Sequence, residues 1–291
     1  MINVIPENLP LGAEITGLNL RNSMTGEQIE QIRQAVHQYG VVFIRGQEIS
    51  PAQQLSFAKY FGEPEQHLLH GGTNYTLPEH PEMLVVSNVI ENGKQIGIMD
   101  AGSEWHTDLS YSKNPTYLSM LYSLQVPHGP DGLPLGSTAF VSTSFSYDTL
   151  PEKIKDALTG KTAVHSYAAR VRARELAGTK RIPPTKEQLD RAKDVDHPIF
   201  RRHPYCNKIC IFVNKAYTTE INGLKPEQSS GYLQDMYLHM TRPDFAYQHQ
   251  WRVGDLVIWD NTQTQHLASF DYSADQHRRM HRVSLRGTLP I

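Results

Sequence analysis

Apolar side chains recur at helical spacing near the start of the chain. Within residues 27–39, Ile29, Ile32 and Val36 fall on one side of a helix. Gly40 follows directly and is a residue type that ends helices. The pattern therefore predicts an amphipathic helix over this range.

Most other apolar runs are short, which is typical of β-strands. The run VVFIRG at 41–46 is rich in β-branched residues, and apolar side chains occupy alternate positions at 116–126. Further strand-like runs lie at 83–89, 208–213, 255–260 and 280–287. Further helices are predicted at 51–62, 144–159 and 225–241. Because strands and helices do not alternate regularly, the pattern favours a barrel or sandwich over a doubly wound sheet.

One segment, residues 160–205, follows neither pattern clearly. It is polar, basic and interrupted by prolines, as in GTKRIPPTKEQLDRAKDVDHP, and we expect at most one short helix in it. Such a segment is more often a lid or a crossover than a second core. We therefore expect a single domain over residues 1–291, with a lid or insert around 160–205.

The bulk composition argues against several classes of protein. Apolar residues make up 39% of the 291 residues, enough for a sizeable core, and the formal net charge is only −2. This balance gives no electrostatic reason to expect a nucleic-acid or membrane partner. The sequence has no long apolar stretch and no secretory signal, so we expect a soluble, cytoplasmic protein.

The two cysteines, Cys206 and Cys210, are four residues apart. This even spacing predicts that both lie on one face of a strand. A metal or redox pair is one reading of the spacing. We expect instead two reduced, partly buried thiols.

The first candidate for chemistry is the segment Trp105-His106-Thr107-Asp108. On extended backbone the side chains of His106 and Asp108 point the same way, so both can reach one metal ion. Two histidines and one carboxylate are the usual protein donors for non-haem iron(II). The triplet alone is weak evidence, because a surface turn gives the same pattern, and a third ligand is needed.

The C-terminal part of the chain offers that third ligand. The strand-like run DLVIWD leads to a turn and then to His266, and Arg278 and Arg282 follow. If 278–286 is a strand, the two arginines share one face. A planar guanidinium suits two-point recognition of a carboxylate, although a solvated basic strand edge has the same sequence pattern.

Several motifs occur in order along the chain: VVFIRGQ, WHTD, the GST segment at 136–138, FVNKAYTT, WRVGDLVIWDN and QHRRMHR. Together they resemble the TauD/TfdA family of dioxygenases. The resemblance implies a mainly β fold with flanking helices, a double-stranded β-helix of the cupin-like jelly-roll type. It also implies an oxidoreductase that uses Fe(II), 2-oxoglutarate and O2 to hydroxylate a C–H bond, with succinate and CO2 as products.

The resemblance also assigns roles to particular residues. It implies that His106, Asp108 and His266 are the catalytic iron ligands. It implies that Arg278 forms a salt bridge with the distal carboxylate of 2-oxoglutarate, and that the Thr138 hydroxyl binds the same carboxylate.

Other matches concern the prime substrate. The resemblance implies that Arg282 either faces its acidic group or lies beside the co-substrate, and that Trp105, Tyr217 and His70 line its pocket. Gly102 departs from the family pattern, because taurine-using members carry an asparagine there. Taurine itself is therefore disfavoured as the substrate.

We expect the substrate to be a small anionic molecule: a sulfonate, sulfate ester, phenoxy acid or other carboxylate. The alternative within the same chemistry is a hydroxylase that tailors a natural product or an amino acid. A non-catalytic cupin-like binding protein is opposed by the ligand set and the two arginines. A zinc hydrolase is opposed by the lack of a denser histidine cluster in the sequence. By analogy with the family we also expect a homo-oligomer, either a dimer or a tetramer.

Overall fold

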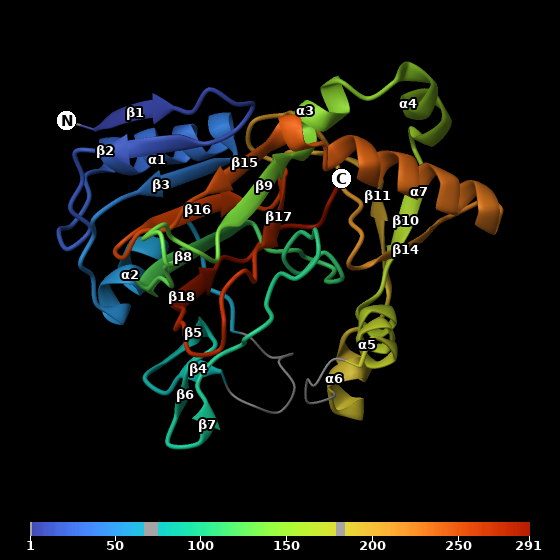
Figure 1. Ribbon diagram of the computed structural model, residues 1–291. Helices are drawn as coiled ribbons and strands as arrows, with labels where there is room; N and C mark the ends of the chain where they lie inside the picture. Colours follow the sequence, from blue (N-terminus) through green and yellow to red (C-terminus); the bar gives the residue numbers. More distant parts are fainter. Residues whose placement is uncertain (1, 67–74, 179–183) are drawn as a thin grey trace.

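The centre of the molecule is a large sheet in a computed structural model that describes residues 2–66, 75–178 and 184–291 (Figure 1). Its strand order is β1-β2-β3-β16-β8-β18-β5-β4, and all neighbours are antiparallel except β2 and β3. The strands are β1 (Asn3–Pro6), β2 (Ala13–Thr16), β3 (Val41–Ile44), β16 (Leu256–Asp260), β8 (Leu118–Gln125), β18 (Arg279–Ser284), β5 (His80–Ser87) and β4 (Thr76–Leu77).

Both faces of this sheet are apolar, because alternate residues of a strand point to opposite sides. In β16, Ile258 joins one buried cluster, whereas Val257 and Trp259 join another on the opposite face. The first cluster includes side chains of the helices α1 (Gly26–Tyr39) and α2 (Pro51–Ala58), which pack along the sheet (Figure 1). The second face is not covered by these two helices and packs on another sheet.

A three-stranded sheet of β15 (Ala246–His249), β9 (Thr138–Ser142) and β17 (Thr264–Ala268) packs on that second face. Phe140 of β9 and Trp259 of β16 lie with ring centroids 5.7 Å apart and so join the two sheets. The protein is therefore mainly β with flanking helices, as predicted.

Residues 160–205 contain more regular structure than the sequence pattern predicted. Their described part forms two helices and three strands, and β10 pairs with both β11 and β14. The elements of this region and its neighbours are β10 (Thr162–His165), α5 (Tyr167–Leu176), α6 (Lys186–Arg191), β11 (Val195–Pro198), β12 (Phe200–Arg202), β13 (Ile209–Ile211), β14 (Thr218–Ile221) and α7 (Pro226–Met240). The expectation of at most one short helix is wrong, because strands of three or four residues are too short to show a period and are fixed by tertiary packing.

Two other sequence predictions need correction. The single helix predicted at 144–159 is two helices, α3 (Thr143–Asp148) and α4 (Glu152–Leu158), since Pro151 stands between them and has no N–H to continue the first. The two cysteines do not share a strand. Cys206 lies half-buried in a turn next to Asn207, whose φ is 63°, and the buried Cys210 is in β13.

The remaining predicted elements are confirmed to within a few residues, apart from α2, which ends at Ala58 rather than Gly62. Three of the strands that matter for the site, β9, β15 and β17, were not predicted. Short elements complete the described structure: β6 (Ile90–Glu91), β7 (Lys94–Gln95) and the 3-10 helix η1 (Pro243–Phe245).

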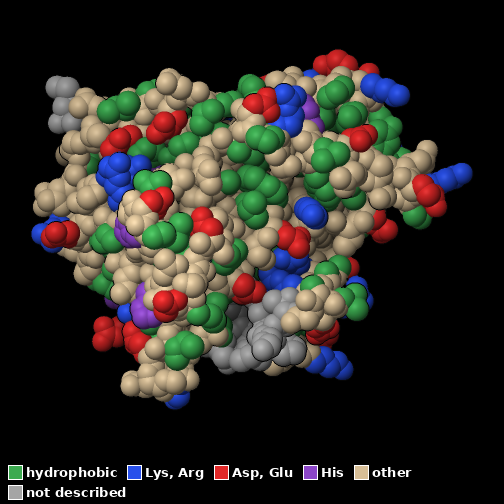
Figure 2. Space-filling view, viewed as in Figure 1, with side chains coloured by type: hydrophobic (Ala, Val, Ile, Leu, Met, Phe, Trp, Pro, Cys, Tyr) green, Lys and Arg blue, Asp and Glu red, His purple; other side chains and the backbone are tan. Residues whose placement is uncertain are grey.

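Charged side chains of both signs are interspersed on the face shown in Figure 2. This agrees with the near-balance of 28 Lys and Arg against 30 Asp and Glu. Because these charges nearly cancel, any recognition of an anion must depend on local groups rather than on the net charge.

Among the described residues, no helix has the length and apolar character needed to cross a membrane.

Candidate metal and co-substrate site

Two imidazoles and one carboxylate, from His106, Asp108 and His266, converge where β17 meets the loop before β8. The Nε2 atoms of His106 and His266 lie 3.6 and 4.0 Å from Asp108 Oδ1. All three residues are buried, and one potential ligand atom of each lies within 4.8 Å of the others. The structure thus brings together the three residues that the sequence motifs selected.

Backbone pairing explains this convergence. The His106 N–H donates to the His266 carbonyl at 3.2 Å, and the His266 N–H donates to the His106 carbonyl at 2.9 Å. This is a single antiparallel bridge between β17 and the loop. It places the two imidazole rings side by side, with centroids 4.1 Å apart.

The two histidine rings are placed so that each can offer a lone pair. His106 Nδ1 lies 2.9 Å from the Glu104 carbonyl, which can only accept, so Nδ1 carries the proton and Nε2 is left for a metal. Burial, together with the nearby His106, holds the pKa of His266 well below its usual value. The ring of Trp259 packs against that of His266, with 4.9 Å between the ring centroids.

Asp108 is held as a carboxylate. Burial by itself raises its pKa, but Arg282 and His266 outweigh this effect and hold the pKa well below the usual range. Arg282 Nη1 donates to Asp108 Oδ1 at 3.0 Å. The second oxygen, Oδ2, accepts the Ser119 hydroxyl at 2.7 Å.

This donor set fits a ferrous ion. Two neutral imidazoles and one carboxylate on one side of the ion are the facial triad of non-haem iron(II) oxygenases, and they leave other coordination positions open. The three ligand atoms lie within 4.8 Å of one another, so one ion could be held by all three residues.

A second group with metal-ligand spacing, His37, His203 and Asp260, has a different character. His203 Nε2 donates to Asp260 Oδ2 at 2.7 Å, and His37 Nε2 lies 2.6 Å from the hydroxyl of Tyr117. Its ligand atoms are thus already paired with each other and with neighbouring protein groups. We interpret this group as a structural hydrogen-bond network beneath the turn that precedes His266.

Arg278, the predicted 2-oxoglutarate ligand, is a buried cation. Among the described residues no carboxylate lies within 4.0 Å of its guanidinium, and its Nε has no hydrogen-bond partner. Burial lowers its pKa, an effect that Tyr272 and Asp271 oppose. Gly136 has φ of +71°, and a Cβ there would lie 3.0 Å from Arg278 Cδ and Nε, so only glycine permits this close approach.

Thr138 lies in β9, two residues beyond Gly136. Its Oγ1 accepts a hydrogen bond from Trp251 Nε1 at 3.0 Å, and both residues are buried. Accepting this bond leaves the Thr138 hydroxyl hydrogen free to donate to another acceptor. The sequence analysis missed Trp251, although it begins the motif WRVGDLVIWDN.

Aromatic side chains line one side of the site. The ring of Tyr217 lies 6.5 Å from that of His106, and Tyr111 lies 4.7 Å from Tyr217 and 4.8 Å from Tyr167 of α5. The structure therefore places Tyr217 beside the candidate metal ligands. It adds Tyr111 and Tyr167, which no motif singled out.

For the other residues predicted to contact the substrate, the structure gives less information. Trp105 is half-buried and immediately precedes His106, and His70 lies outside the described residues. Gly102 has φ of +82°, and a Cβ there would lie 3.3 Å from Ala268 Cβ and 3.5 Å from His106 Cε1. The contact with His106 is an ordinary one, so the left-handed φ is the main reason for a glycine at this position.

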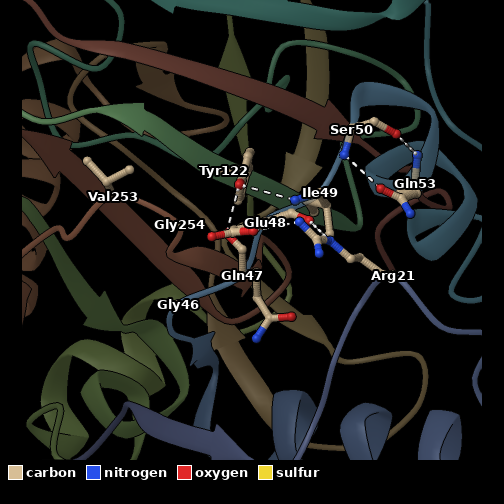
Figure 3. A pocket seen from close by; sticks show the side chains of 10 residues that line it. All are labelled: Arg21, Gly46, Gln47, Glu48, Ile49, Ser50, Gln53, Tyr122, Val253 and Gly254. Atoms are coloured by element: carbon tan, nitrogen blue, oxygen red, sulfur yellow. Dashed lines mark hydrogen bonds and ion pairs between the residues drawn. The ribbon is translucent and has the colours of Figure 1, made fainter.

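A separate hollow of about 540 Å³ lies at the start of α2 (Figure 3). Its polar groups are already paired: Tyr122 donates to the Gln47 carbonyl at 2.8 Å, and Arg21 forms an ion pair with Glu48 at 2.6 Å. Its lining includes none of the residues named above as candidate ligands. The chemistry therefore centres on the triad.

Comparison with known proteins agrees with this geometry. Residues 4–284 match the family described as "Taurine catabolism dioxygenase TauD, TfdA family". The chain is 29% identical over 264 residues to pentalenolactone F synthase of Streptomyces arenae, covering 88% of this chain and 86% of that protein. It is 28% identical over 281 residues to the alpha-ketoglutarate-dependent 2,4-dichlorophenoxyacetate dioxygenase of a Burkholderia species, covering 94% and 91%.

A crystal structure of a putative alpha-ketoglutarate-dependent taurine dioxygenase from Burkholderia xenovorans superposes with a TM-score of 0.80 at 27% identity, covering 100% of this chain and 91% of that one. The resemblance inferred from the ordered motifs is thereby confirmed. The chain belongs to the TauD/TfdA family of iron(II)- and 2-oxoglutarate-dependent dioxygenases.

Proposed function

We propose that this dioxygenase hydroxylates a C–H bond of a small anionic organic molecule: a sulfonate, a sulfate ester, a phenoxy acid or another carboxylate. The observation that carries the proposal is the position of Arg282. Its side chain is only 13% exposed, and its guanidinium lies 3.0 Å from Asp108 Oδ1, beside the triad. A buried guanidinium at that point attracts and orients an anion next to the metal.

In this proposal His106, Asp108 and His266 hold the iron. With iron, 2-oxoglutarate and O2 bound, the site supplies the oxidising power that converts C–H to C–OH, while 2-oxoglutarate becomes succinate and CO2. We infer that the two β-sheets that enclose the site form the jelly-roll, or double-stranded β-helix, that the resemblance implies. The protein contributes position, a dry environment and fixed charge.

Arg278 and Thr138 seat the co-substrate. The buried Arg278 guanidinium receives the distal carboxylate of 2-oxoglutarate, which supplies the counter-charge that the described residues do not place within ion-pair distance. The Thr138 hydroxyl donates to the same carboxylate while accepting from Trp251. Trp251 therefore orients a group that would otherwise rotate.

The aromatic wall limits the shape of the substrate. Tyr217, Tyr111 and Tyr167 present ring faces and edges, so they favour an apolar or aromatic body attached to the anionic group. Gly102 also lacks the asparagine side chain that taurine-using members carry at this position. We expect a pocket of this kind to suit a bulkier molecule than taurine.

A substrate panel tests the proposal. Purified protein with Fe(II), ascorbate, O2 and 2-oxoglutarate is offered alkyl sulfonates, alkyl sulfates and phenoxyacetates, each paired with its neutral amide or alcohol analogue. We expect succinate formation with at least one anion and much less with its neutral partner. Equal turnover of both partners would contradict the role of Arg282.

A second candidate has support from one observation. Pentalenolactone F synthase is among the relatives, with 29% identity over 264 residues. This favours the alternative that the chain tailors a biosynthetic intermediate or an amino acid by the same chemistry. Turnover of such molecules, with none of the simple anions accepted, would select this candidate.

A further inference from the structure

The two oxygens of Asp108 have different surroundings. Oδ1 faces the Nε2 atoms of His106 and His266, at 3.6 and 4.0 Å. Oδ2 accepts the hydroxyl of Ser119 at 2.7 Å. One oxygen is thus directed to the metal centre and the other is bonded back into the protein.

Ser119 is a polar residue inside an apolar strand. It lies in β8 with 0% of its surface exposed, between Leu118 and Met120, which belong to the cluster on the helix-covered face. Its Oγ accepts from Asn261 Nδ2 at 3.0 Å. Because the hydroxyl has one hydrogen, accepting from Asn261 leaves that hydrogen for Asp108.

Asn261 is fixed in turn by two donors. Its Oδ1 accepts from the Asp108 backbone N–H at 3.2 Å and from Trp259 Nε1 at 3.1 Å. These two donors identify the amide oxygen, so Nδ2 must face Ser119. Asn261 therefore holds both the backbone of Asp108 and, through Ser119, its carboxylate.

The backbone next to Asp108 needs such support. Leu109 has φ of +50°, a left-handed conformation that is unfavourable for a leucine. Leu109 packs against the buried cluster that contains Tyr111 and Tyr167. The amide of Asn261 and this packing together keep the chain in a turn that it would otherwise avoid.

We propose that Ser119 and Asn261 are positioning residues that make Asp108 present only Oδ1 to the metal. This inference rests on the proposed role of the triad. By keeping Oδ2 away from the ion, the network prevents two-oxygen binding by Asp108, which would occupy a position that the co-substrate needs. Oδ1 has two lone pairs, so it can serve the metal while Arg282 donates to it.

The test is metal binding by the purified full-length chain, with Co(II) as an oxygen-stable probe. The variants are Ser119→Ala and Asn261→Ala, and Ser119→Thr restores the hydroxyl. Ser123→Ala is the matched control, because Ser123 is also a buried hydroxyl in β8 but donates to the Arg252 carbonyl instead. Dissociation constants, the d–d absorption of bound Co(II) and the subsequent affinity for 2-oxoglutarate are measured.

We expect Ser119→Ala and Asn261→Ala each to weaken Co(II) binding by about 10-fold or more. Both should change the d–d spectrum and weaken 2-oxoglutarate binding, whereas Ser123→Ala matches the wild type and Ser119→Thr recovers most of the affinity. Unchanged affinity and spectrum in both alanine variants would overturn the inference.

Failure of the underlying proposal looks different. If His266→Ala binds Co(II) as tightly as the wild type, the triad is not the metal site, whatever the Ser119 variants do. If His266→Ala loses binding while Ser119→Ala and Asn261→Ala do not, the triad stands and the positioning network alone is refuted.

Discussion

Arg170 Nη1 lies 2.7 Å from Glu104 Oε1, and this ion pair joins α5 to the loop that carries the first metal ligand. The Arg170 side chain is 7% exposed. The carbonyl of Glu104 also accepts from His106 Nδ1. Helix α5 is thereby tied to the residue that sets the orientation of a candidate metal ligand.

We predict a measurable coupling across this pair. In a double-mutant cycle of Arg170→Met and Glu104→Gln, urea unfolding should give an interaction energy of about 1 kcal/mol, since one partner is partly exposed. Both single variants should also raise the KM of the prime substrate. Additive effects on stability and an unchanged KM would show that α5 and the loop are independent.

Loss of a triad residue should abolish turnover without unfolding the protein. His266→Ala removes a lone pair that the other donors cannot replace, so 2-oxoglutarate-dependent O2 consumption should fall to background. Circular dichroism should remain that of the wild type, because the core around Trp259 and Phe140 is kept. Full 2-oxoglutarate turnover in this variant would rule out His266 as a ligand.

Arg278→Ala should act mainly on the co-substrate. Removing a charged, hydrogen-bonded contact should weaken 2-oxoglutarate binding by about 1–3 kcal/mol, and Arg278→Lys should recover only part of this, because an ammonium cannot bind a carboxylate in a two-point manner. Calorimetry with Mn(II)-loaded protein measures the effect. Trp251→Phe tests the smaller contribution of the hydrogen bond to Thr138, and an unaltered affinity in Arg278→Ala would exclude the assigned role.

Gly102→Ala should destabilise the fold through its backbone. The positive φ costs a non-glycine residue about 1–2 kcal/mol, whereas the new Cβ would lie 3.3 Å from Ala268 Cβ and at an ordinary contact distance of 3.5 Å from His106 Cε1. A lower midpoint of denaturation with metal binding retained is the expected result. Gly132→Ala is a suitable control, since φ is +77° there and nothing lies within 4 Å of the new Cβ, so a much larger loss of stability in Gly102→Ala would show that the contact with Ala268 matters as well.

Acid should destabilise the protein through His165. This buried residue lies 5.2 Å from His197 between ring centroids, and burial, followed by the charge of His197, lowers the pKa of His165 to about 3. The folded state therefore prefers neutral His165. Its contribution is fully present above the unfolded pKa of 6.5 and is lost as the pH falls toward 3, by up to about 1.4 kcal/mol per pH unit.

His165→Phe should flatten this dependence, because phenylalanine does not titrate and keeps a ring against Phe212. The measurement is the free energy of unfolding of both proteins between pH 7 and pH 4. Parallel curves would mean that His165 does not set the acid sensitivity.

The sequence predicted the elements with clear periods. The helix α1 was found because Ile29, Ile32 and Val36 repeat at helical spacing, and the strand β8 because its apolar residues alternate without a break. The strands of the small sheet were missed. In β17 the residues Thr264, Gln265 and His266 are polar and still buried. They are buried because β17 pairs with β9 and carries a residue of the triad, so the strand shows no apolar pattern.

Parts of the site were equally hidden. Ser119 lies at an intervening position of the alternating strand, so its polar side chain gave no signal, while Asn261 lay inside a quoted motif without an assigned role. Asn261 Oδ1 meets the Asp108 N–H across 153 residues. A contact between two residues so far apart in the sequence leaves no local sequence pattern.

By itself the sequence determined the donor types, the ordered motifs and the family, since these are properties of short segments read in order. The tertiary structure alone decided that Asp108 turns Oδ1 toward the histidines, that α5 is tied to Glu104, and that Gly102 adopts a left-handed φ beside His106. The reason is physical: hydrogen-bond direction, burial and steric room depend on groups brought together from distant parts of the chain.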